Sequence, residues 1–568
     1  MMQKGVLKRF WRDNFYVIVL LVTGSMSWFL TMVKSGIVYP FGMGFWGANG
    51  HDGVWHISLI NLLARGSREM PVFAGNNIKN YHLGFDLLVA GIHRVTHLPV
   101  VNLYFQIIPP ILAVLVGIST YLFVIKWTKS KESAIWSIFF IYFGGSLAWI
   151  FGMGESTFWS QQAISTLINP PFALSLIGIF FGLYFLVRYE KSRQLSDFLG
   201  AIFFLGSLVE VKAYAGILVL GSLMVGGIWQ IIKEKRYELF KVFSGSTGFS
   251  LILFLFLNRG AENLFIFQPL WFLQTLFNLD RFSIPRVESA ISNYNLAQNT
   301  TKLIPAYILA FLVFWIGNMG TRLMKEIKVV QWVKNPMSIS SMEVFIAVMI
   351  MGGVFIPMVV VQQGTPWNTI QFFYYSLVFS GVLGGVAMPK IIEKIKGRNL
   401  RYAFIFAVVV FTIPTTLITL KDVYLPGRPP AKISTEELGA LEYLRSQPEG
   451  VVLTYPYDAV KAKEAENSPP RSLYVYDSTA YVSAFSEKAV FLEDEVNLNI
   501  TNFNWRERRG MVEEFLGTLD QRAAREFLKE NNISYVYWLK GQRAKLGESQ
   551  LGLVKIFENN EVDVFKVE

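Results

Sequence analysis

The chain has 568 residues, of which 52% are hydrophobic and only 16% are charged, and its mean hydropathy is +0.39. Soluble proteins carry about 25% charged residues, so this composition excludes an ordinary soluble protein and predicts an integral membrane protein. The net charge of +11 divides into +16 for residues 1–420 and −5 for residues 421–568. A basic membrane part with an acidic tail does not favour nucleic-acid binding, and the lack of cysteine excludes disulfides and thiolate chemistry.

Eleven apolar segments follow one another along residues 1–420. A helix that crosses the roughly 30 Å hydrocarbon layer needs about 20 such residues. The candidate spans lie at 16–34, 102–125, 134–152, 171–187, 197–211, 214–232, 242–257, 303–321, 342–361, 369–388 and 402–420. The sequence therefore predicts a polytopic α-helical protein with about eleven crossings.

The distribution of Lys and Arg gives the orientation. The N-terminal stretch "MMQKGVLKRFWRDNF" is basic, and the apolar run after it lacks a small-residue cleavage pattern, so we expect a retained first helix. With the N-terminus inside, the inner segments hold 23 of the 33 Lys and Arg residues of the membrane part. This predicts a plasma or inner-membrane protein with a cytoplasmic N-terminus. The loops 35–101 and 258–302 and the C-terminal domain, residues 421–568, then lie outside.

The first outer loop, residues 35–101, holds all five histidines of the chain. Its stretches "DGVWHISLINLLARG" and "YHLGFDLLVAGIHRV" gather apolar residues toward one side, which predicts two amphipathic helices on the membrane surface. Asp52 and His56 are spaced i, i+4 on the first helix, and His82 and Asp86 have the same spacing on the second. Two helices that each carry an Asp–His pair predict one shared polar site.

Simpler interpretations of these residues stay open. Asp52 begins a helix, so its carboxylate can serve only as an N-cap, a contact worth about 1 kcal/mol. His56 can be an interfacial histidine. The stretch "IHRVTHLP" is typical of a helix end near the headgroups, which would leave His93 and His97 outside the site.

Polar groups also gather at three other outer positions. The fifth span is short, so Glu210 and Lys212 at the tip of the next hairpin lie near membrane depth, where charges tend to be functional, unless they only pair with each other. The stretch 154–171 carries amides and Glu155, and 362–377 carries amides and aromatic rings. The latter is also typical of an interfacial aromatic belt. The candidates in it are Trp367, Asn368, Gln371 and Tyr375.

A Pro-rich linker, "YLPGRPP", precedes the C-terminal domain. A helix with Ser434 or Thr435 as N-cap, a strand "GVVLTYP", a long helix over about 505–530 and a strand "ISYVYWL" predict an α/β fold. A terminal hairpin turns at Asn559–Asn560. This domain shows no catalytic constellation.

The early outer-loop stretch "GHDGVWHISLI", followed by "NYHLGFDLLVAGI", resembles the GT-C superfamily of integral membrane glycosyltransferases. The resemblance implies a transmembrane catalytic module, residues 1–420, that transfers a hexosyl or pentosyl unit from a polyprenyl-phosphate donor. It places Asp52 at the catalytic acidic position. The acceptor would be a glycan, lipid or protein of the cell envelope. The loop has no Asp-x-Asp pair, so a divalent metal is only a possibility; its ligands would be Asp52, His56, His82 and Asp86.

The chemistry of sugar transfer explains why such residues are needed. An acceptor hydroxyl attacks the anomeric carbon from the face opposite the phosphate, which inverts the configuration, and a carboxylate removes the proton. We expect Asp52 to be that general base. The leaving lipid phosphate needs positive charge, for which Lys212 is the first candidate and Arg259 and Arg286 are weaker ones. The alternatives are a lipid or polysaccharide transporter or flippase, and a non-catalytic cell-envelope assembly component.

Overall fold

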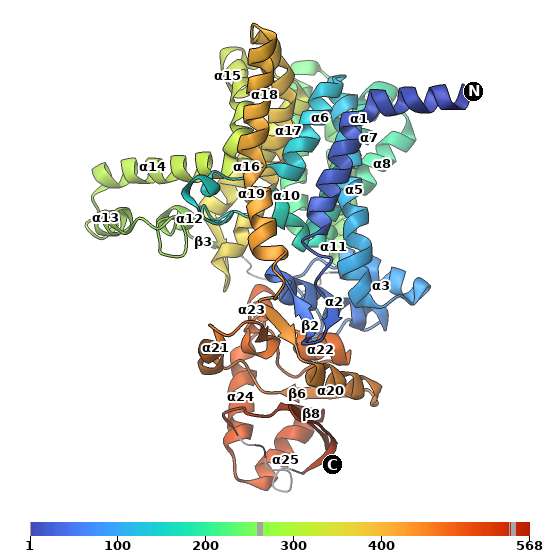
Figure 1. Ribbon diagram of the computed structural model, residues 1–568, viewed down its shortest axis with the longest axis vertical. Coiled ribbons are helices and arrows are strands. Elements are labelled where there is room, and N and C mark those ends of the chain that lie inside the picture. The colour runs from blue at the N-terminus through green and yellow to red at the C-terminus, as the bar shows by residue number, and fades with distance from the viewer. Residues whose placement is uncertain (1, 258–264, 545, 547–551) are drawn as a thin grey trace.

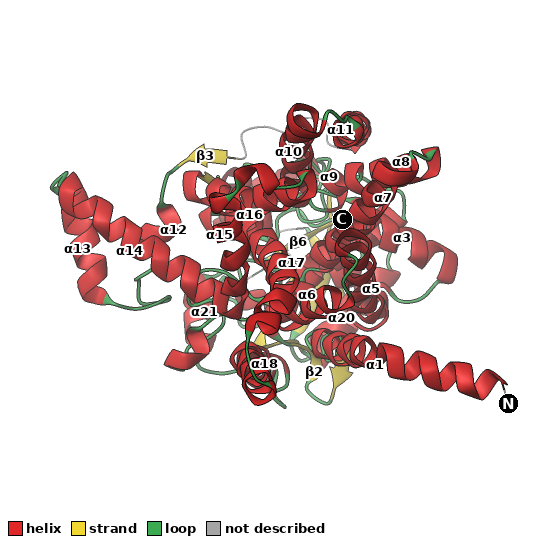
Figure 2. Ribbon diagram, turned by 90° about the horizontal axis from the view of Figure 1, so that it is seen from above, coloured by secondary structure: helices red, strands yellow, loops and turns green. Residues whose placement is uncertain are grey.

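The computed structural model describes residues 2–257, 265–544, 546 and 552–568, with side chains from residue 14 onward. A helical bundle forms one end of the molecule and the C-terminal domain the other (Figure 1). The N-terminus lies at the bundle end far from the C-terminal domain. Seen from above, the C-terminus lies beneath the middle of the bundle (Figure 2). The two ends of the chain thus lie at opposite ends of the molecule.

Each predicted apolar segment contains a helix. In the described part of the chain, eight helical stretches are long and apolar enough to span a membrane. Their principal helices are α5 (Ile108–Thr128), α7 (Pro170–Ser192), α10 (Ala213–Trp229), α11 (Glu238–Leu257), α14 (Thr300–Met319), α16 (Ser341–Val359), α17 (Gln371–Lys394) and α18 (Arg398–Thr412). Three predicted spans remain: α1 (Met2–Phe29) covers 16–34 up to residue 29, α6 (Lys131–Phe143) covers 134–152 up to residue 143, and α8 (Leu195–Gly206) with α9 (Leu208–Val211) covers 197–211. Helix α19 (Pro414–Thr419) continues the stretch that begins with α18.

One predicted span lies differently from the rest. Helix α14, which covers the span expected at 303–321, runs crosswise to the bundle axis and projects from it together with α13 (Pro285–Leu296) and α12 (Trp271–Gln274) (Figures 1 and 2). The chain then continues toward the end of the bundle that holds the N-terminus through α15 (Glu326–Lys334). The predicted segment at 303–321 is therefore an apolar helix of sufficient length that lies crosswise to the other helices. Hydropathy records how apolar a helix is, not its direction.

A buried arginine joins two helix ends inside the bundle. Arg322 follows α14 and is 2% exposed, although the sequence placed it in an inner loop. Its guanidinium donates to the carbonyls of Gly145, Asn318 and Met319 and to the side-chain oxygen of Gln162. These carbonyls lie where α6 and α14 end and lack helical partners. Arg322 satisfies them, as backbone at membrane depth requires.

The first outer loop and the C-terminal domain form one sheet. Its strand order is β1 (Ile37–Tyr39), β2 (Gly42–Phe45), β5 (Ala431–Ile433) and β7 (Arg471–Ser472), with Met43 opposite Ile433. Helix α2 (Asp52–Ala64) packs beside this sheet and is buried from Gly53 to Leu63. The expected surface position of α2 is wrong, because apolar residues surround the helix and the C-terminal domain covers it. Helix α3 (Gly84–Thr96) is amphipathic as predicted and leaves Leu87 and Leu88 exposed.

The remainder of the C-terminal domain is α/β. Its sheet has the order β6 (Val451–Thr454), β8 (Ile533–Leu539), β10 (Val562–Val567) and β9 (Leu553–Glu558), with β6 and β8 parallel. Ser434 caps α20 (Thr435–Ser446) in a capping box, as predicted. Its smaller helices are α21 (Ala459–Ala465), α22 (Tyr481–Ser486) and α23 (Glu495–Ile500).

The long helix expected over 505–530 is two helices, α24 (Trp505–Gly517) and α25 (Gln521–Glu530). The Asp520 carboxylate accepts backbone N–H groups of Arg522 and Ala523 and so starts the second helix. A short antiparallel pair, β3 (Phe265–Phe267) and β4 (Val360–Gln362), lies at the C-terminal-domain end of the bundle.

Candidate active site

A cavity of 290 Å³ lies where the membrane bundle, the first outer loop and the C-terminal domain meet. Its walls come from α2, the α9–α10 hairpin, β4, the start of α17, and α23 of the C-terminal domain. The polar and ionisable residues that line it are Asp52, Trp55, His56, Asn80, Tyr81, His82, Asn169, Lys212, Tyr214, Gln362, Asn368, Gln371 and Asn497. Segments more than 400 residues apart in the sequence therefore build one site.

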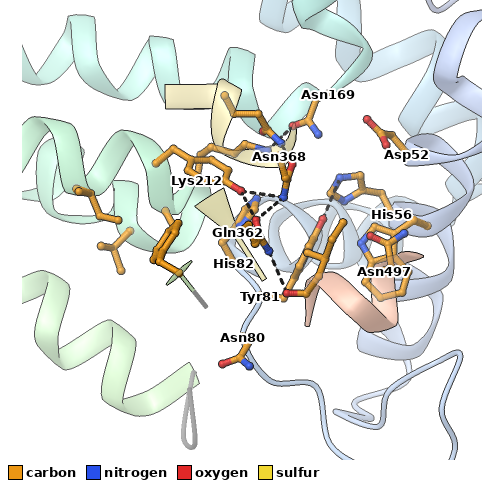
Figure 3. Close-up of a pocket in the computed structure, with 18 of the residues that line it drawn as sticks. Asp52, His56, Asn80, Tyr81, His82, Asn169, Lys212, Gln362, Asn368 and Asn497 are labelled. Atoms are coloured by element: carbon orange, nitrogen blue, oxygen red, sulfur yellow. Dashed lines mark hydrogen bonds between the residues drawn. The ribbon is translucent and has the colours of Figure 1, made fainter. Parts of the chain in front are cut away.

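Asp52 is the first residue of α2 and lies on one side of the cavity (Figure 3). The N-cap position of α2 belongs to His51, and no side chain caps the helix. The Asp52 carboxylate makes no hydrogen bond or ion pair with the described residues, so it is not only a helix cap. A free carboxylate at a cavity wall is available to a substrate hydroxyl.

His56 lies one turn after Asp52 on the same face, as predicted. Its Nδ1 lies 2.7 Å from Asp86 Oδ1, and both side chains are buried. Tyr81 Oη approaches the other ring nitrogen at 3.5 Å. Burial raises the pKa of Asp86, and the nearby His56 opposes this rise. The expected pairing of His82 with Asp86 is wrong, because α3 begins only at Gly84 and its Asp86 turns toward α2 instead.

The opposite wall carries one ammonium group among amides (Figure 3). Lys212 Nζ donates to Asn169 Oδ1 at 3.1 Å and is electrostatically coupled to the carboxylates of Asp52 and Asp86. The hydrogen bond of the ammonium group is thus directed to Asn169 on the cavity wall. Lys212 is thus the cation that faces Asp52 across the cavity.

An amide network holds the wall next to Lys212. Asn368 Nδ2 donates to Gln362 Oε1 at 2.7 Å and to Tyr214 Oη at 2.9 Å, and Gln371 donates to Asn368. His82 Nε2 lies in the same cavity without a hydrogen-bond partner in the described structure. Burial, together with the charge of Lys212, lowers the pKa of His82 well below its usual value, so its ring is neutral. These groups can donate to an anion held near Lys212.

One end of the cavity is apolar and opens outward. Ile217 of α10, Phe254 of α11 and Phe265 of β3 line it and are also 38–44% exposed on the outside of the molecule. A chain of hydrocarbon in the bilayer can reach the cavity at this end.

Several predicted candidates lie outside the cavity lining. Trp367 is 49% exposed. Tyr375 is buried and its hydroxyl bonds Ser175 at 2.7 Å, so it packs inside the bundle. Glu155 lies in the outer loop before α7, where its carboxylate accepts the Gln162 N–H at 3.4 Å and burial raises its pKa to about 7. The sequence of a polar stretch does not show in which direction each side chain points, so the positions of these three residues could not be predicted from it.

The weaker candidates also lie elsewhere. Arg286 is on α13, far along the projecting arm, and Arg259 lies outside the described residues. His93 bonds the Leu98 carbonyl at 2.7 Å and His97 is the C-cap of α3, so both belong to a helix end, as the simpler interpretation had it.

Sequence reasoning missed the contribution of the C-terminal domain. Asn497 and Ile500 of α23 line the cavity, and Gln362 Nε2 donates to the Ile500 carbonyl at 3.1 Å. His51, next to Asp52, bonds both the carbonyl and the hydroxyl of Ser478. Nothing in the local sequence signals these contacts, because they join segments that only the tertiary fold brings together.

The residues expected to hold a divalent metal do not form a suitable set. The described residues contain no group of three or more His, Asp or Glu side chains placed to hold one ion. His56 and Asp86 use their facing atoms on each other, and Lys212 directs a positive charge into the cavity. The mechanism below therefore has no step through a metal.

No protein-family model matches the chain, and no curated protein matches its sequence. Its structure is similar to that of the oligosaccharyltransferase AglB from Archaeoglobus fulgidus, solved with an inhibitory peptide and a dolichol-phosphate. The two are 12% identical with a TM-score of 0.55, and the match covers 93% of this chain and 70% of that one. The mycobacterial arabinofuranosyltransferase AftD is 11% identical with a TM-score of 0.55, over 98% of this chain and 40% of that one. The chain is therefore an integral membrane protein with the GT-C fold of membrane glycosyltransferases.

Proposed function

We propose that this protein is an inverting glycosyltransferase that moves a hexosyl or pentosyl unit from a polyprenyl-phosphate donor to an acceptor hydroxyl at the outer face of the membrane. The acceptor is a glycan, lipid or protein of the cell envelope. The observation that carries this proposal is the free carboxylate of Asp52, which faces Lys212 across a cavity with an apolar outward end.

The donor fits the wall that holds Lys212. The ammonium group and the neutral donor groups around it suit a phosphate, whose charge grows as the sugar leaves. The apolar end formed by Ile217, Phe254 and Phe265 suits the polyprenyl chain, because a hydrocarbon tail is stable only where it stays in contact with lipid or apolar side chains. The dolichol-phosphate bound to the structurally similar AglB supports the same class of donor.

The transfer is a single displacement. The acceptor oxygen forms a bond to the anomeric carbon of the sugar while the bond from that carbon to the phosphate oxygen breaks. The hydroxyl proton passes to the Asp52 carboxylate, and the electron pair of the broken bond stays on the polyprenyl phosphate next to Lys212. Attack opposite the leaving group inverts the anomeric configuration.

His56 and Asp86 support this step as positioning residues. Asp86 fixes one ring nitrogen of His56 at 2.7 Å, so the ring has one orientation on the face of α2 that also carries Asp52. Holding the cavity wall rigid keeps the base and the acceptor at reacting distance.

The test is transfer from a panel of radiolabelled polyprenyl-phosphate sugars by the purified full-length protein in nanodiscs. We expect Asp52→Asn to lower the transfer rate by about 10²- to 10⁴-fold while donor binding persists. The exposed Asp422→Asn, a matched change outside the cavity, should transfer like the unchanged protein. Undiminished transfer by Asp52→Asn refutes the assigned base. In sealed proteoliposomes, label that crosses the membrane still attached to its lipid would indicate a flippase instead.

A further inference from the structure

A second hollow lies on the C-terminal domain beside the catalytic cavity. It consists of two adjoining pockets of 30 and 210 Å³ that share Tyr455, Pro456 and Tyr457 as lining residues. The segment from Tyr474 to Tyr481 and the start of α23 form its inner part. We name this hollow the tyrosine groove, after its residues Tyr455, Tyr457, Tyr474, Tyr476 and Tyr481.

Two contacts connect the tyrosine groove to the catalytic cavity. Asn497, which lines the cavity, donates its side-chain N–H to Asp494 of the groove at 2.8 Å. Tyr476 of the groove packs edge-on against the ring of His51, with 4.7 Å between the ring centres. His51 directly precedes Asp52. The groove therefore lies next to the segment that carries the proposed catalytic base.

The lining chemistry suits hydroxyl groups and ring faces. Four of the five tyrosines are partly exposed, and a tyrosine offers a flat apolar ring with a polar group at one end. Thr479 is 4% exposed, and its hydroxyl has no partner in the described structure; the side-chain oxygen of Gln542 also lacks one. Buried polar groups are rarely left without hydrogen bonds. A ligand rich in hydroxyl groups would satisfy both.

Among its described lining residues, the groove offers an anionic ligand no free positive charge. Its carboxylates are Asp458, Asp477, Glu493, Asp494, Glu495 and Glu513. The two arginines in the lining are engaged: Arg509 pairs with Glu495 and Glu513, and Arg543 pairs with Asp458. Asp477 remains exposed. Carboxylates accept hydrogen bonds from sugar hydroxyls but repel phosphate, sulfate and uronate groups.

We propose that the tyrosine groove binds the acceptor, and that the acceptor is a neutral, polyhydroxylated glycan chain whose terminal hydroxyl reaches Asp52. This inference rests on the proposed function, since it names the acceptor of the same site. It assigns the C-terminal domain the task of selecting the acceptor, while the membrane module holds the donor.

Binding is tested with the full-length protein in nanodiscs and three end-labelled fluorescent probes: short neutral glycans, uronic-acid chains of the same length, and an uncharged Ser/Asn/Gly peptide. We expect the neutral glycans alone to bind. Tyr457→Ala should weaken that binding about tenfold, a typical loss for a buried aromatic contact. Tyr443→Ala, a half-buried tyrosine of the same domain outside the groove, should not. Melting temperatures show that both variants are folded.

The result separates this inference from the proposed function. Equal binding of uronic-acid chains, binding of the peptide alone, or equal loss in the two tyrosine variants overturns the inference. Tyr457→Ala should bind a labelled polyprenyl phosphate as the unchanged protein does. If transfer fails with every donor while neutral glycans still bind in the groove, the proposed enzyme activity is wrong and the glycan site stands.

Discussion

The two walls of the catalytic cavity differ in origin and in chemistry. The wall built by the membrane helices carries Lys212, the amides Asn169 and Asn368, and apolar side chains that open outward. The wall built by the first outer loop and the C-terminal domain carries Asp52 and continues into the carboxylates and tyrosines of the groove. One wall suits an anionic lipid and the other a neutral polyhydroxylated chain.

This difference explains why the membrane module and the C-terminal domain share one sheet and line one cavity. The proposed reaction needs a base on one wall to face the leaving phosphate on the other, at a fixed distance. The shared sheet, in which β2 of the loop pairs with β5 of the C-terminal domain, fixes the outer wall as one unit. Lys212, between α9 and α10, then sets the position of the donor phosphate relative to that outer wall.

Among the substitutions that test the difference between the two walls, the largest loss of transfer rate is expected at the donor wall. Lys212→Ala removes the cation next to the leaving phosphate, so the transfer rate should fall by about 10²- to 10³-fold, as for the loss of one transition-state donor group. Binding of labelled polyprenyl phosphate should weaken in parallel, whereas neutral-glycan binding should not change. Lys302→Ala, at an exposed lysine of the projecting arm, is the matched control. If Lys212→Ala weakens glycan binding but not donor binding, the two walls have been assigned the wrong way round.

A smaller loss of transfer rate is expected when the buried His56–Asp86 pair is broken. Asp86→Leu leaves His56 without its 2.7 Å partner, which should cost about 1–3 kcal/mol of unfolding free energy. Transfer should fall about tenfold or more, because α2 and α3 lose the contact that orients His56. Asp86→Asn keeps an acceptor oxygen and should recover most of the stability. Unfolding of the detergent-solubilised protein and initial rates measure both; unchanged stability in Asp86→Leu would contradict the role of this pair.

The sequence predicted the donor wall better than the acceptor wall. Apolar spans and the inside excess of Lys and Arg are local properties, so the helices and the placement of Lys212 at a hairpin tip could be derived from the sequence. On the other wall, Asp52 could be named as a candidate, because it lies early in the first outer loop. The direction of α14 and the burial of α2 depend on neighbours distant in the sequence, so the first was not predicted and the expected surface position of α2 was wrong.

The acceptor wall could not be derived for the same physical reason. Tyr455, Tyr476 and Asn497 are ordinary residues of an α/β domain when read locally, and only the fold gathers them beside His51. The one-turn spacing of His82 and Asp86 suggested a helical pair, yet the helix starts between them. A periodic pattern predicts a shared face only when both residues are in the helix.

A moderate loss of transfer rate is expected from a change at His51, the residue before Asp52, where the C-terminal domain contacts the first outer loop. His51→Phe removes both bonds to Ser478 while keeping a ring against Tyr476, so Asp52 should be held less firmly. We expect kcat to fall about tenfold with the KM for the donor unchanged, since a small displacement of a reacting group lowers the rate steeply. In the Asp52→Asn background the same change should have no further effect on the residual rate, as coupled residues require. An equal loss in both backgrounds would show that His51 acts only on folding.

The smallest effect is expected from pH, and two carboxyl groups of the acceptor wall should contribute to it. Burial raises the pKa of Glu493 to about 8 and that of Asp494 to about 7, although backbone N–H groups of Val482 and Ser483 stabilise the Glu493 carboxylate. The folded protein therefore holds protons that the unfolded chain has released above its ordinary carboxyl pKa near 4. Stability from these groups is complete below that pH and is lost as the pH rises through 7 and 8. The melting temperature should fall by a few degrees from pH 6 to pH 9, and Glu493→Gln should flatten the fall, whereas the exposed Glu466→Gln should not. A melting temperature that rises over this range would mean that the groove carboxylates are charged in the folded state, and the outer wall would then repel anionic acceptors even more strongly.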